Sequence, residues 1–571
     1  MSTAAAGAAG SSRQASSIEW PGLGVRVAAL VVSTVIGSFL ALGGLATPPP
    51  APKDASSFSA ERAMGFARAL LGDEPRPAGS AANAAAALRL TEWLRARGLE
   101  VESSEAKVRA NGRDVTIRNV LARKTGAMPG PAILLCAHHD SAAASPGAGD
   151  DGFGVGVLLE MAAALGSGPW PGRDIILLFT DGEESGLLGA RHFVNNHPWH
   201  AKVGAVINVD NRGNSGPSIL YDVCGDSADL LQACSTALGP VVGSSLYAEI
   251  ASRMPNSSDL SVFREAGMSG MNFAVIGGHE HYHAPSDDWK TADLSSLQHQ
   301  GEVTLTAAQA LAAHRHDSPK ADGGAVYQDI AGQMLAWWPV RAGITASIGC
   351  VALLSVTGLV AVRRMRVSLR HVALGWFAAG VRFLVAGVAA WIILQLGALA
   401  GLHGMETATA ALPDASLAER YKAAFWPSHG PLVMAGTLAA SLTAAWFASR
   451  PLLRGREPLC GFIGAWAAFA VFAAFLAVVL PGASAPILPI VLLASLPLVA
   501  SVFLMEGREH LGVLATIAVG GFLTGLMLAP VEALGWLGVG LSMPEFAALR
   551  AATLALALLP ALTPRSGAAT R

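Results

Sequence analysis

The chain has 571 residues, of which 52% are hydrophobic and only 14% are charged, and its mean hydropathy is +0.44. Soluble domains contain about 25% charged residues, so this composition excludes an entirely soluble protein and predicts a membrane protein. The net charge of −2 at pH 7 gives no indication of a nucleic-acid partner. Five cysteines are too few for a disulfide framework, although Cys224 and Cys234 could pair in an oxidising compartment.

The N-terminal region is predicted to contain a tail and one membrane span. Residues 1–22 are rich in Ala, Ser and Gly, and we expect a disordered tail on the cytoplasmic side. The apolar run that follows is long enough to cross roughly 30 Å of hydrocarbon. We predict a transmembrane anchor over residues 23–47 rather than a cleaved signal peptide, because the apolar core of a signal peptide is shorter.

Residues 55–325 have ordinary charge density and alternate between short apolar runs and helical patterns. We expect strands at 99–109, 114–123, 132–137, 175–180, 203–209 and 271–276, and helices at 80–97, 154–165, 187–195 and 228–238. Buried strands separated by helices predict an α/β domain with helices on both faces of its sheet.

Polar residues with metal-binding chemistry follow the apolar runs of this domain. The segments are LLCAHHDS, PGAGDDGFG, LLFTDGEESGLLGA, INVDNRG and HEHYHAPSDD, so His, Asp, Glu, Asp and His occur in that order. A single such residue after a strand is usually a turn or capping residue. Several strands that end at one rim of a sheet, however, bring the residues after them into one pocket. The complete set therefore predicts a metal site.

The charges of this set favour two metal ions over one. Asp150, Glu184 and Asp210 are negative, and a bridging hydroxide would add a fourth negative charge, which together balance two dications. Two dications about 3.5 Å apart repel by roughly 19 kcal/mol at an effective dielectric constant of about 20, so neutral ligands alone could not hold them. A carboxylate between the ions is expected.

These residues resemble the co-catalytic zinc exopeptidases, a family that includes bacterial secreted aminopeptidases and glutamate carboxypeptidase. The resemblance extends from RPAGSAANAAAALRLTEWLRARGLEV at 76–101, through SSDLSVFREAG at 257–267, to YHAPSDD at 282–288. It implies a three-layer α/β domain with a mixed, mainly parallel sheet and two Zn²⁺ ions. The ligands that it implies are His138 and Asp210 for one zinc, Glu184 and His283 for the other, and Asp150 as the bridge.

The resemblance also assigns two residues to the catalytic machinery. Asp140 resembles the carboxylate that orients the imidazole of the ligand His138. Glu183 resembles the general base, which takes a proton from the bridging water and returns it to the leaving amine. The alternative is that Glu183 and Glu184 only begin the next helix, where carboxylates favour the helix dipole. Asp151 resembles the residue after the bridge, where the family has a cis peptide.

A second zinc-protease motif overlaps this set. His279, Glu280 and His283 spell H-E-x-x-H, which belongs to a different class of metalloprotease. That chemistry requires a helix, so that both His side chains lie on one face. Two glycines precede the motif and Pro285 follows it, so we predict no helix here and interpret the match as accidental.

Residues 340–563 are a series of long apolar runs, in which we expect about seven transmembrane helices. Their predicted ranges are 342–362, 373–399, 430–449, 460–480, 485–505, 511–530 and 545–563. Basic residues lie in alternate loops and at the C-terminus: Arg363, Arg364, Arg366, Arg370, Arg450, Arg454, Arg456, Arg508, Arg565 and Arg571. One topology places all of them in the cytoplasm and puts residues 55–325 on the opposite side of the membrane. We expect that side to be the periplasm of a bacterial inner membrane, in preference to a vacuolar or endoplasmic reticulum lumen.

The layout resembles membrane-anchored members of the family, such as the vacuolar membrane protease and the endoplasmic reticulum metallopeptidase. Few ionisable residues interrupt the spans, Arg382 being the most conspicuous, so the membrane part is interpreted as an anchor or a substrate-presenting scaffold. The expected partners are peptide substrates and the lipid bilayer.

The predicted function is that of a membrane-bound zinc exopeptidase that hydrolyses N-terminal residues of peptides with a water bridging two metals. Three alternatives remain open. The first is a single-zinc acyltransferase similar to glutaminyl cyclase, which the number of bound metals would distinguish. The second is an inactive peptidase-like scaffold, and the third is a transporter whose outer domain acts as a sensor.

Overall fold

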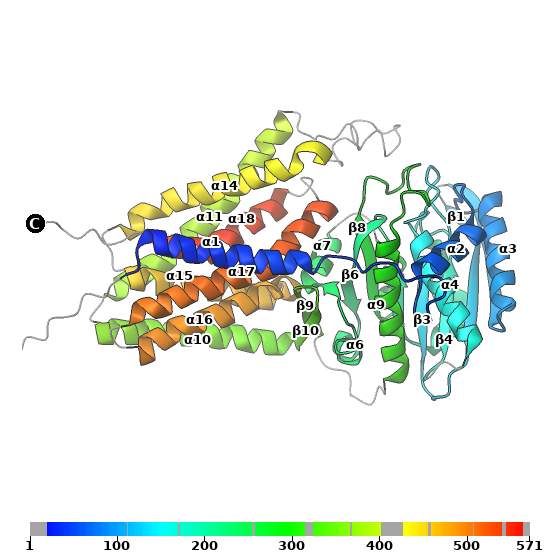
Figure 1. The fold of residues 1–571 in the computed structure, drawn as a ribbon, viewed down its shortest axis with the longest axis horizontal. Coiled ribbons are helices and arrows are strands. Elements are labelled where there is room, and N and C mark those ends of the chain that lie inside the picture. The colour runs from blue at the N-terminus through cyan, green and yellow to red at the C-terminus, as the bar shows by residue number, and fades with distance from the viewer. Residues whose placement is uncertain are drawn as a thin grey trace, which may run out of the picture.

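The protein consists of an α/β domain beside a bundle of long helices (Figure 1). This computed structural model describes residues 20–110, 112–168, 172–253, 257–314, 324–365, 368–400, 426–454, 458–505, 508–539 and 544–562. Most of the predicted N-terminal tail and the basic residues Arg366, Arg456, Arg565 and Arg571 lie outside these ranges.

The α/β domain is built on a sheet of eight strands in the order β1-β2-β4-β3-β5-β8-β6-β7. The strands are β1 (Glu100–Ala110), β2 (Arg113–Lys124), β3 (Ala132–His138), β4 (Ile175–Thr180), β5 (Val203–Val209), β6 (Ser215–Cys224), β7 (Val242–Gly243) and β8 (Ser269–Gly277). The pairs β3/β4, β3/β5, β5/β8 and β6/β7 are parallel, and the pairs β1/β2, β2/β4 and β6/β8 are antiparallel. The expected mixed, mainly parallel sheet is therefore confirmed, whereas β6 and β7 were not predicted.

Helices cover both faces of the sheet. They are α2 (Ala60–Leu71), α3 (Ala81–Arg95), α4 (Gly152–Ser167), α5 (Leu188–Asn196), α6 (Ser227–Cys234), α7 (Ser245–Ala251), α8 (Asp259–Glu265) and α9 (Leu294–Ala313). Alternate residues of β3 enter different cores: Ile133 and Leu135 pack with α2, α4 and α9, while Leu134 and Cys136 pack with α5 and α8. Because both faces of the central strands are buried, these strands are continuous apolar runs in the sequence.

The five cysteines are all buried, and Cys136, Cys224, Cys234 and Cys350 are free thiols. Cys224 belongs to the core on the α5 and α8 face, and Cys234 to the core on the α4 and α9 face. Their thiols lie near the carbonyl oxygens of Met268 and Ala307, respectively, at 3.8 Å in each case. The possible Cys224–Cys234 pair is therefore not formed, because the sheet separates the two thiols.

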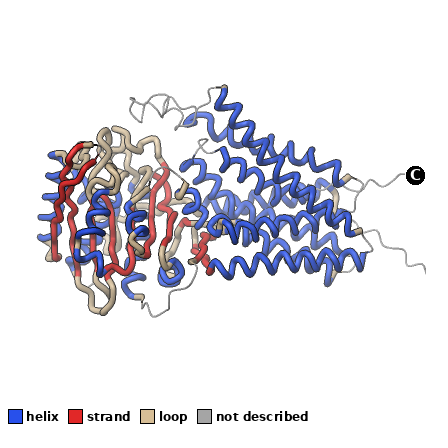
Figure 2. Tube along the Cα trace, turned by 180° about the vertical axis from the view of Figure 1, so that it is seen from behind, coloured by secondary structure: helices blue, strands red, loops and turns tan. Residues whose placement is uncertain are grey.

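The bundle contains helices from both ends of the chain. They are α1 (Leu23–Gly43), α10 (Val340–Met365), α11 (Leu369–Leu399), α14 (Trp426–Leu453), α15 (Pro458–Val479), α16 (Ile487–Leu504), α17 (Glu509–Val539) and α18 (Pro544–Leu558). The hairpin of β9 (Ala325–Ile330) and β10 (Met334–Pro339) lies where the bundle meets the α/β domain (Figure 2). Helix α1 packs along α17 over its length (Figure 1).

Seven of the described helices are long and apolar enough to cross a membrane, namely α1, α10, α11, α14, α15, α16 and α17. Helix α18 has only 15 residues, so the last predicted span, 545–563, remains a prediction. Large apolar side chains project from the outside of the bundle; Phe39 is 77% exposed and Leu384 is 64% exposed. An apolar surface of this kind is stable in lipid rather than in water, so the bundle implies a bilayer around it.

Candidate active site

Loops that follow the central strands bring the five expected metal ligands together. His138 ends β3, Asp210 directly follows β5, and Glu184 lies in the loop after β4. Asp150 precedes α4, and His283 lies in the loop after β8. The carboxyl ends of β3, β4, β5 and β8 meet at one rim because these four strands are mutually parallel.

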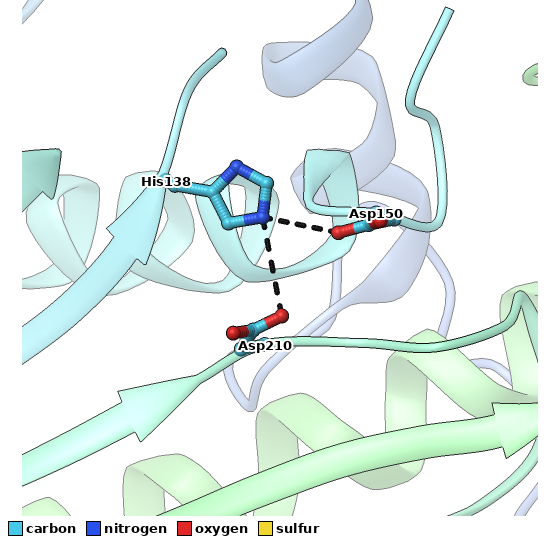
Figure 3. Close-up of side chains that lie close together, drawn as sticks. All are labelled: His138, Asp150 and Asp210. Atoms are coloured by element: carbon cyan, nitrogen blue, oxygen red, sulfur yellow. Dashed lines mark hydrogen bonds and ion pairs between the residues drawn. The ribbon is translucent and has the colours of Figure 1, made fainter. Parts of the chain in front are cut away.

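The five residues form two groups that share Asp150. In the first group, Nε2 of His138 lies 3.0 Å from Oδ1 of Asp150 and 3.9 Å from Oδ1 of Asp210 (Figure 3). In the second group, Nε2 of His283 lies 3.3 Å from Oδ2 of Asp150 and 2.8 Å from Oε2 of Glu184. Within each group, the potential ligand atoms lie within 4.8 Å of one another. The two oxygens of Asp150 thus face opposite groups.

The residues present fit a bound metal. Oε1 of Glu184 and Nε2 of His283 are buried without a hydrogen-bond partner among the described residues. The short distance from Nε2 of His283 to Glu184 is therefore a contact without hydrogen-bond geometry. A buried polar atom without a partner costs about 1–3 kcal/mol, which a cation would relieve. Imidazole nitrogens and carboxylate oxygens are ligands that zinc accepts.

The electrostatics of the site also favour a cation. Burial raises the pKa of Asp210 well above its ordinary value, and the negative charge of Asp150 raises it further. Burial disfavours the charged form of His283, but Asp150 and Glu184 outweigh this effect and raise its pKa to about 10. The protein groups in the pocket do not fully neutralise the negative charge of its carboxylates. A bound dication would compensate the remaining charge.

Asp140 connects the loop after β3 to the loop after β4. Its carboxylate accepts hydrogen bonds from the backbone N–H groups of Glu183 (3.2 Å) and Glu184 (3.3 Å). Nδ1 of His138 lies 3.2 Å from the backbone oxygen of Asp140 and 3.5 Å from its Oδ1. Asp140 therefore contacts both the imidazole of one expected ligand and the backbone of another.

Two further residues position the loop that carries Asp150. The carboxylate of Asp287 accepts hydrogen bonds from the backbone N–H groups of Gly149 (2.8 Å) and Asp150 (3.2 Å). Arg76 is fully buried and donates to the backbone oxygens of His139, Pro146 and Gly147. The sequence analysis did not predict that Asp287 and Arg76 position this loop. The only indication in the sequence was that both residues lie inside the segments that resemble the zinc exopeptidases.

Asp151 and the H-E-x-x-H segment have the expected backbone. The peptide bond between Asp150 and Asp151 is cis, as the resemblance implied. Residues 278–283 form turns rather than a helix, with hydrogen bonds from the N–H of His281 to Gly278 and from the N–H of Tyr282 to His279. Among the described residues, His279 belongs to neither potential metal group, so the structure supports the interpretation of the motif as accidental.

A cavity of about 650 Å³ opens beside these residues. Asp150, Glu183, Glu184, Asp210 and His283 all line it. Burial raises the pKa of Glu183 well above its ordinary value, and Asp210 raises it further. Glu183 lines the cavity but belongs to neither potential metal group, so among the described residues it is not a candidate ligand.

The sequence of the α/β domain matches a known protein family. Residues 119–308 match the sequence model of Peptidase family M28, and this segment includes all five expected metal ligands together with Asp140 and Glu183. The α/β domain thus contains a segment similar to peptidase family M28 and is called the M28 domain below. This family is one of metallopeptidases and implies zinc.

Two relatives of this M28 domain are a membrane protease and a metallopeptidase by name. The chain is 30% identical over 293 residues to a vacuolar membrane protease of Yarrowia lipolytica, which covers 50% of this chain and 29% of that protein. It is 28% identical over 219 residues to endoplasmic reticulum metallopeptidase 1 of Mus musculus, which covers 37% of this chain and 24% of that protein. The matches therefore span less than a third of the length of either relative.

Solved structures similar to the M28 domain include two different enzymes. Porphyromonas gingivalis glutaminyl cyclase is 26% identical, with a TM-score of 0.37, over 44% of this chain and 99% of that chain. BSAP, a zinc aminopeptidase from Bacillus subtilis, is 19% identical, with a TM-score of 0.38, over 47% of this chain and 98% of that chain.

Proposed function

We propose that the protein is a membrane-bound exopeptidase that uses two Zn²⁺ ions to hydrolyse the N-terminal residues of peptides. The observation that carries this proposal is the position of Asp150, whose two carboxylate oxygens face different groups of ligands, His138 with Asp210 and His283 with Glu184. A carboxylate with this geometry suits a pair of neighbouring ions better than a single one. Bound zinc would act as a Lewis acid that activates water and polarises the carbonyl of the scissile bond.

In this proposal, Glu183 is the general base. Its carboxylate lines the cavity beside the proposed ligands and its raised pKa suits the temporary storage of a proton. The oxygen of water forms a bond to the carbonyl carbon while Glu183 accepts a proton, and the C–N bond then breaks as that proton passes to the leaving amine. Asp140 holds the backbone of Glu183 and Glu184 in place during these steps.

We also propose that the M28 domain lies outside the cytoplasm. Helix α10 begins at the hairpin beside the M28 domain and α17 ends against that domain, so the junctions α10–α11, α14–α15 and α16–α17 lie at the remote end of the bundle (Figure 1). The described basic residues Arg363, Arg364, Arg450, Arg454 and Arg508 occur at these junctions. The positive-inside rule places them in the cytoplasm. Residues 23–47 and 340–563 then form the membrane part, and residues 55–325 the extracytoplasmic part.

The test is the metal content and peptidase activity of the full-length protein purified in detergent. We expect two zinc ions per chain and hydrolysis of aminoacyl fluorophores with a free amino group, but not of N-acetylated versions. Glu183→Gln is expected to retain both metals and to lower kcat by roughly 100- to 10,000-fold, which is typical for loss of a general base. Glu280→Gln, in the H-E-x-x-H segment, is the matched control and is expected to remain active.

Each other outcome contradicts a specific part of the proposal. A single metal per chain would favour the cyclase-like acyltransferase. Full metal occupancy without hydrolysis of any peptide would favour a scaffold or sensor domain. Loss of activity in Glu280→Gln but not in Glu183→Gln would show that the H-E-x-x-H segment carries the chemistry.

A further inference from the structure

The cavity beside the proposed metal site is lined by a helix of the membrane bundle as well as by the M28 domain. Leu534 and Gly535, near the end of α17, belong to its wall, and so do Ile219 of β6, Ala274 of β8 and Tyr247 of α7. Leu534 is only 3% exposed and packs in one apolar cluster with Ile219, Ala274 and Tyr247. The membrane part therefore closes one side of a cavity that begins at the proposed zinc ligands.

The register of the sheet shows how near this apolar wall is to the metal site. The N–H of Asp210 donates to the backbone oxygen of Phe273, and Ala274 is the next residue of β8. Ala274 is paired with Ile219 on β6, and Ile219 packs with Leu534. Neighbouring strands lie about 4.8 Å apart, so these steps place the wall roughly 10–15 Å from Asp210. An extended peptide advances about 3.5 Å per residue, so two residues together with a long side chain span roughly this separation.

Chemically, the two ends of the cavity differ. Asp150, Glu183, Glu184 and Asp210 line one end, where the peptide bond would be cleaved. The end next to α17 is lined by Ile219, Tyr247, Ile250, Ala274, Ile276 and Leu534. Arg212 and the ion pair of Asp222 with Arg264 also line the cavity. Against the six residues next to α17, a charged side chain would lose more hydration than the hydroxyl of Tyr247 can replace, whereas an apolar side chain would bury its surface.

Helix α17 is held in this position by an ion pair on another side of the helix. Nε of Arg550 in α18 donates a hydrogen bond to Oε1 of Glu532 at 2.6 Å. Glu532 and Leu534 are two positions apart, so they project from different sides of α17. Leu534 can therefore face the cavity while Glu532 attaches the helix to α18.

We propose that the end of α17 is part of the substrate site and that Leu534 contacts an apolar side chain of the bound peptide. This inference rests on the proposed peptidase function and assigns the membrane part a role in substrate recognition. The occupant is an apolar residue at or next to the peptide terminus, and acidic or basic residues are disfavoured at the same position.

The first test compares the selectivity of full-length variants with leucyl, alanyl and glutamyl fluorophores. The wild type is expected to prefer the leucyl substrate. Leu534→Ala is expected to lower the ratio of kcat/KM for leucyl over alanyl substrate by about 10-fold, since a few methylene contacts discriminate to that degree. Leu523→Ala is the matched control, because Leu523 lies in α17 but is buried in the bundle core and not in the cavity wall. An unchanged ratio in Leu534→Ala, or an equal change in Leu523→Ala, would overturn the proposal.

The second test measures binding without turnover. In a Glu183→Gln background, isothermal titration calorimetry measures the affinity for the dipeptides Leu-Leu and Glu-Glu with and without Leu534→Ala. We expect Leu-Leu to bind, Leu534→Ala to weaken that binding several-fold, and Glu-Glu to bind weakly to both proteins. Equal affinities for Leu-Leu with and without Leu534→Ala would overturn the inference. Binding of Leu-Leu that depends on Leu534, in a protein whose wild type hydrolyses no peptide, would support the binding wall while contradicting the peptidase function, so the two failures are distinguishable.

Discussion

The carboxylate of Asp140 accepts a hydrogen bond from the backbone N–H of Glu183 at 3.2 Å. This contact joins the loop after β3, which carries a proposed zinc ligand, to the loop after β4, which carries the proposed base. The side chain expected to orient His138 thus also positions Glu183, and it connects the two loops of the site.

Asp140→Asn tests this connection. An asparagine keeps one oxygen acceptor, but its NH₂ group would face the second N–H donor, from Glu183 or Glu184, so one buried donor loses its partner. We expect kcat to fall by roughly 10- to 100-fold with a smaller change in KM, as is typical for residues that orient metal ligands. Steady-state kinetics and zinc content measure the effect. Wild-type kcat in this variant would show that the Asp140 contact is dispensable.

Asp287→Asn is expected to weaken metal binding through the loop that carries Asp150. Asp287 accepts from two backbone N–H groups of that loop, whereas the neighbouring Asp288 accepts from the N–H groups of Lys290 and Thr291. We expect Asp287→Asn to raise the apparent Kd for zinc by roughly 10- to 100-fold. Asp288→Asn is the matched control and should bind zinc like the wild type. Titration of chelator-treated protein with zinc measures the Kd of both variants. Equal Kd values for Asp287→Asn and Asp288→Asn would contradict a role of Asp287 in positioning the metal-binding loop.

Removal of the metal is expected to destabilise the M28 domain. Without a cation, Asp150, Glu184 and Asp210 repel one another in a buried pocket. A ligand present at about 1,000 times its Kd stabilises the folded state by roughly 4 kcal/mol, so treatment with EDTA should lower Tm by several degrees and zinc should restore it. In Asp150→Ala the dependence of Tm on zinc should be lost. A zinc-dependent Tm in that variant would show that the ion stabilises another site.

Asp329 is expected to make stability depend on pH. It is 2% exposed and accepts hydrogen bonds from the N–H groups of Gly332 and Gly243, and burial raises its pKa from 3.8 to about 6. Between these values the folded protein binds more protons than the unfolded chain, so its stability falls as pH rises through this window. The loss of stability across the whole window corresponds to roughly 3 kcal/mol in the free energy of unfolding.

Asp329→Asn removes this titration. The Tm of the variant relative to the wild type should therefore increase from pH 4 to pH 7 and then become constant. Because all other titrating groups are common to both proteins, the difference in Tm isolates Asp329. A difference that is independent of pH would contradict the expected shift.

Much of the α/β domain could be predicted from local patterns. The runs that form β3, β4, β5 and β8 are continuously apolar because both of their faces are buried, and this signal is present in each segment alone. Strand β6 begins with Ser-Gly-Pro and has irregular register with β8, so it lacks such a signal. The long helix α9 was also missed, since its buried face includes Gln298, His299 and Gln300, which are polar.

The sequence by itself determined which residues could bind metal and which segments could cross a membrane, because both depend on side-chain chemistry and on runs of neighbouring residues. Only the tertiary structure decided that Asp150 faces two groups of ligands, that Asp287 and Arg76 hold its loop, and that Cys224 and Cys234 remain free. It also placed Leu534 beside a cavity whose other residues lie far away in the chain. Most of these relationships join positions far apart in the chain, for example 137 residues between Asp150 and Asp287. They arise from tertiary packing, which produces no periodic pattern in the sequence.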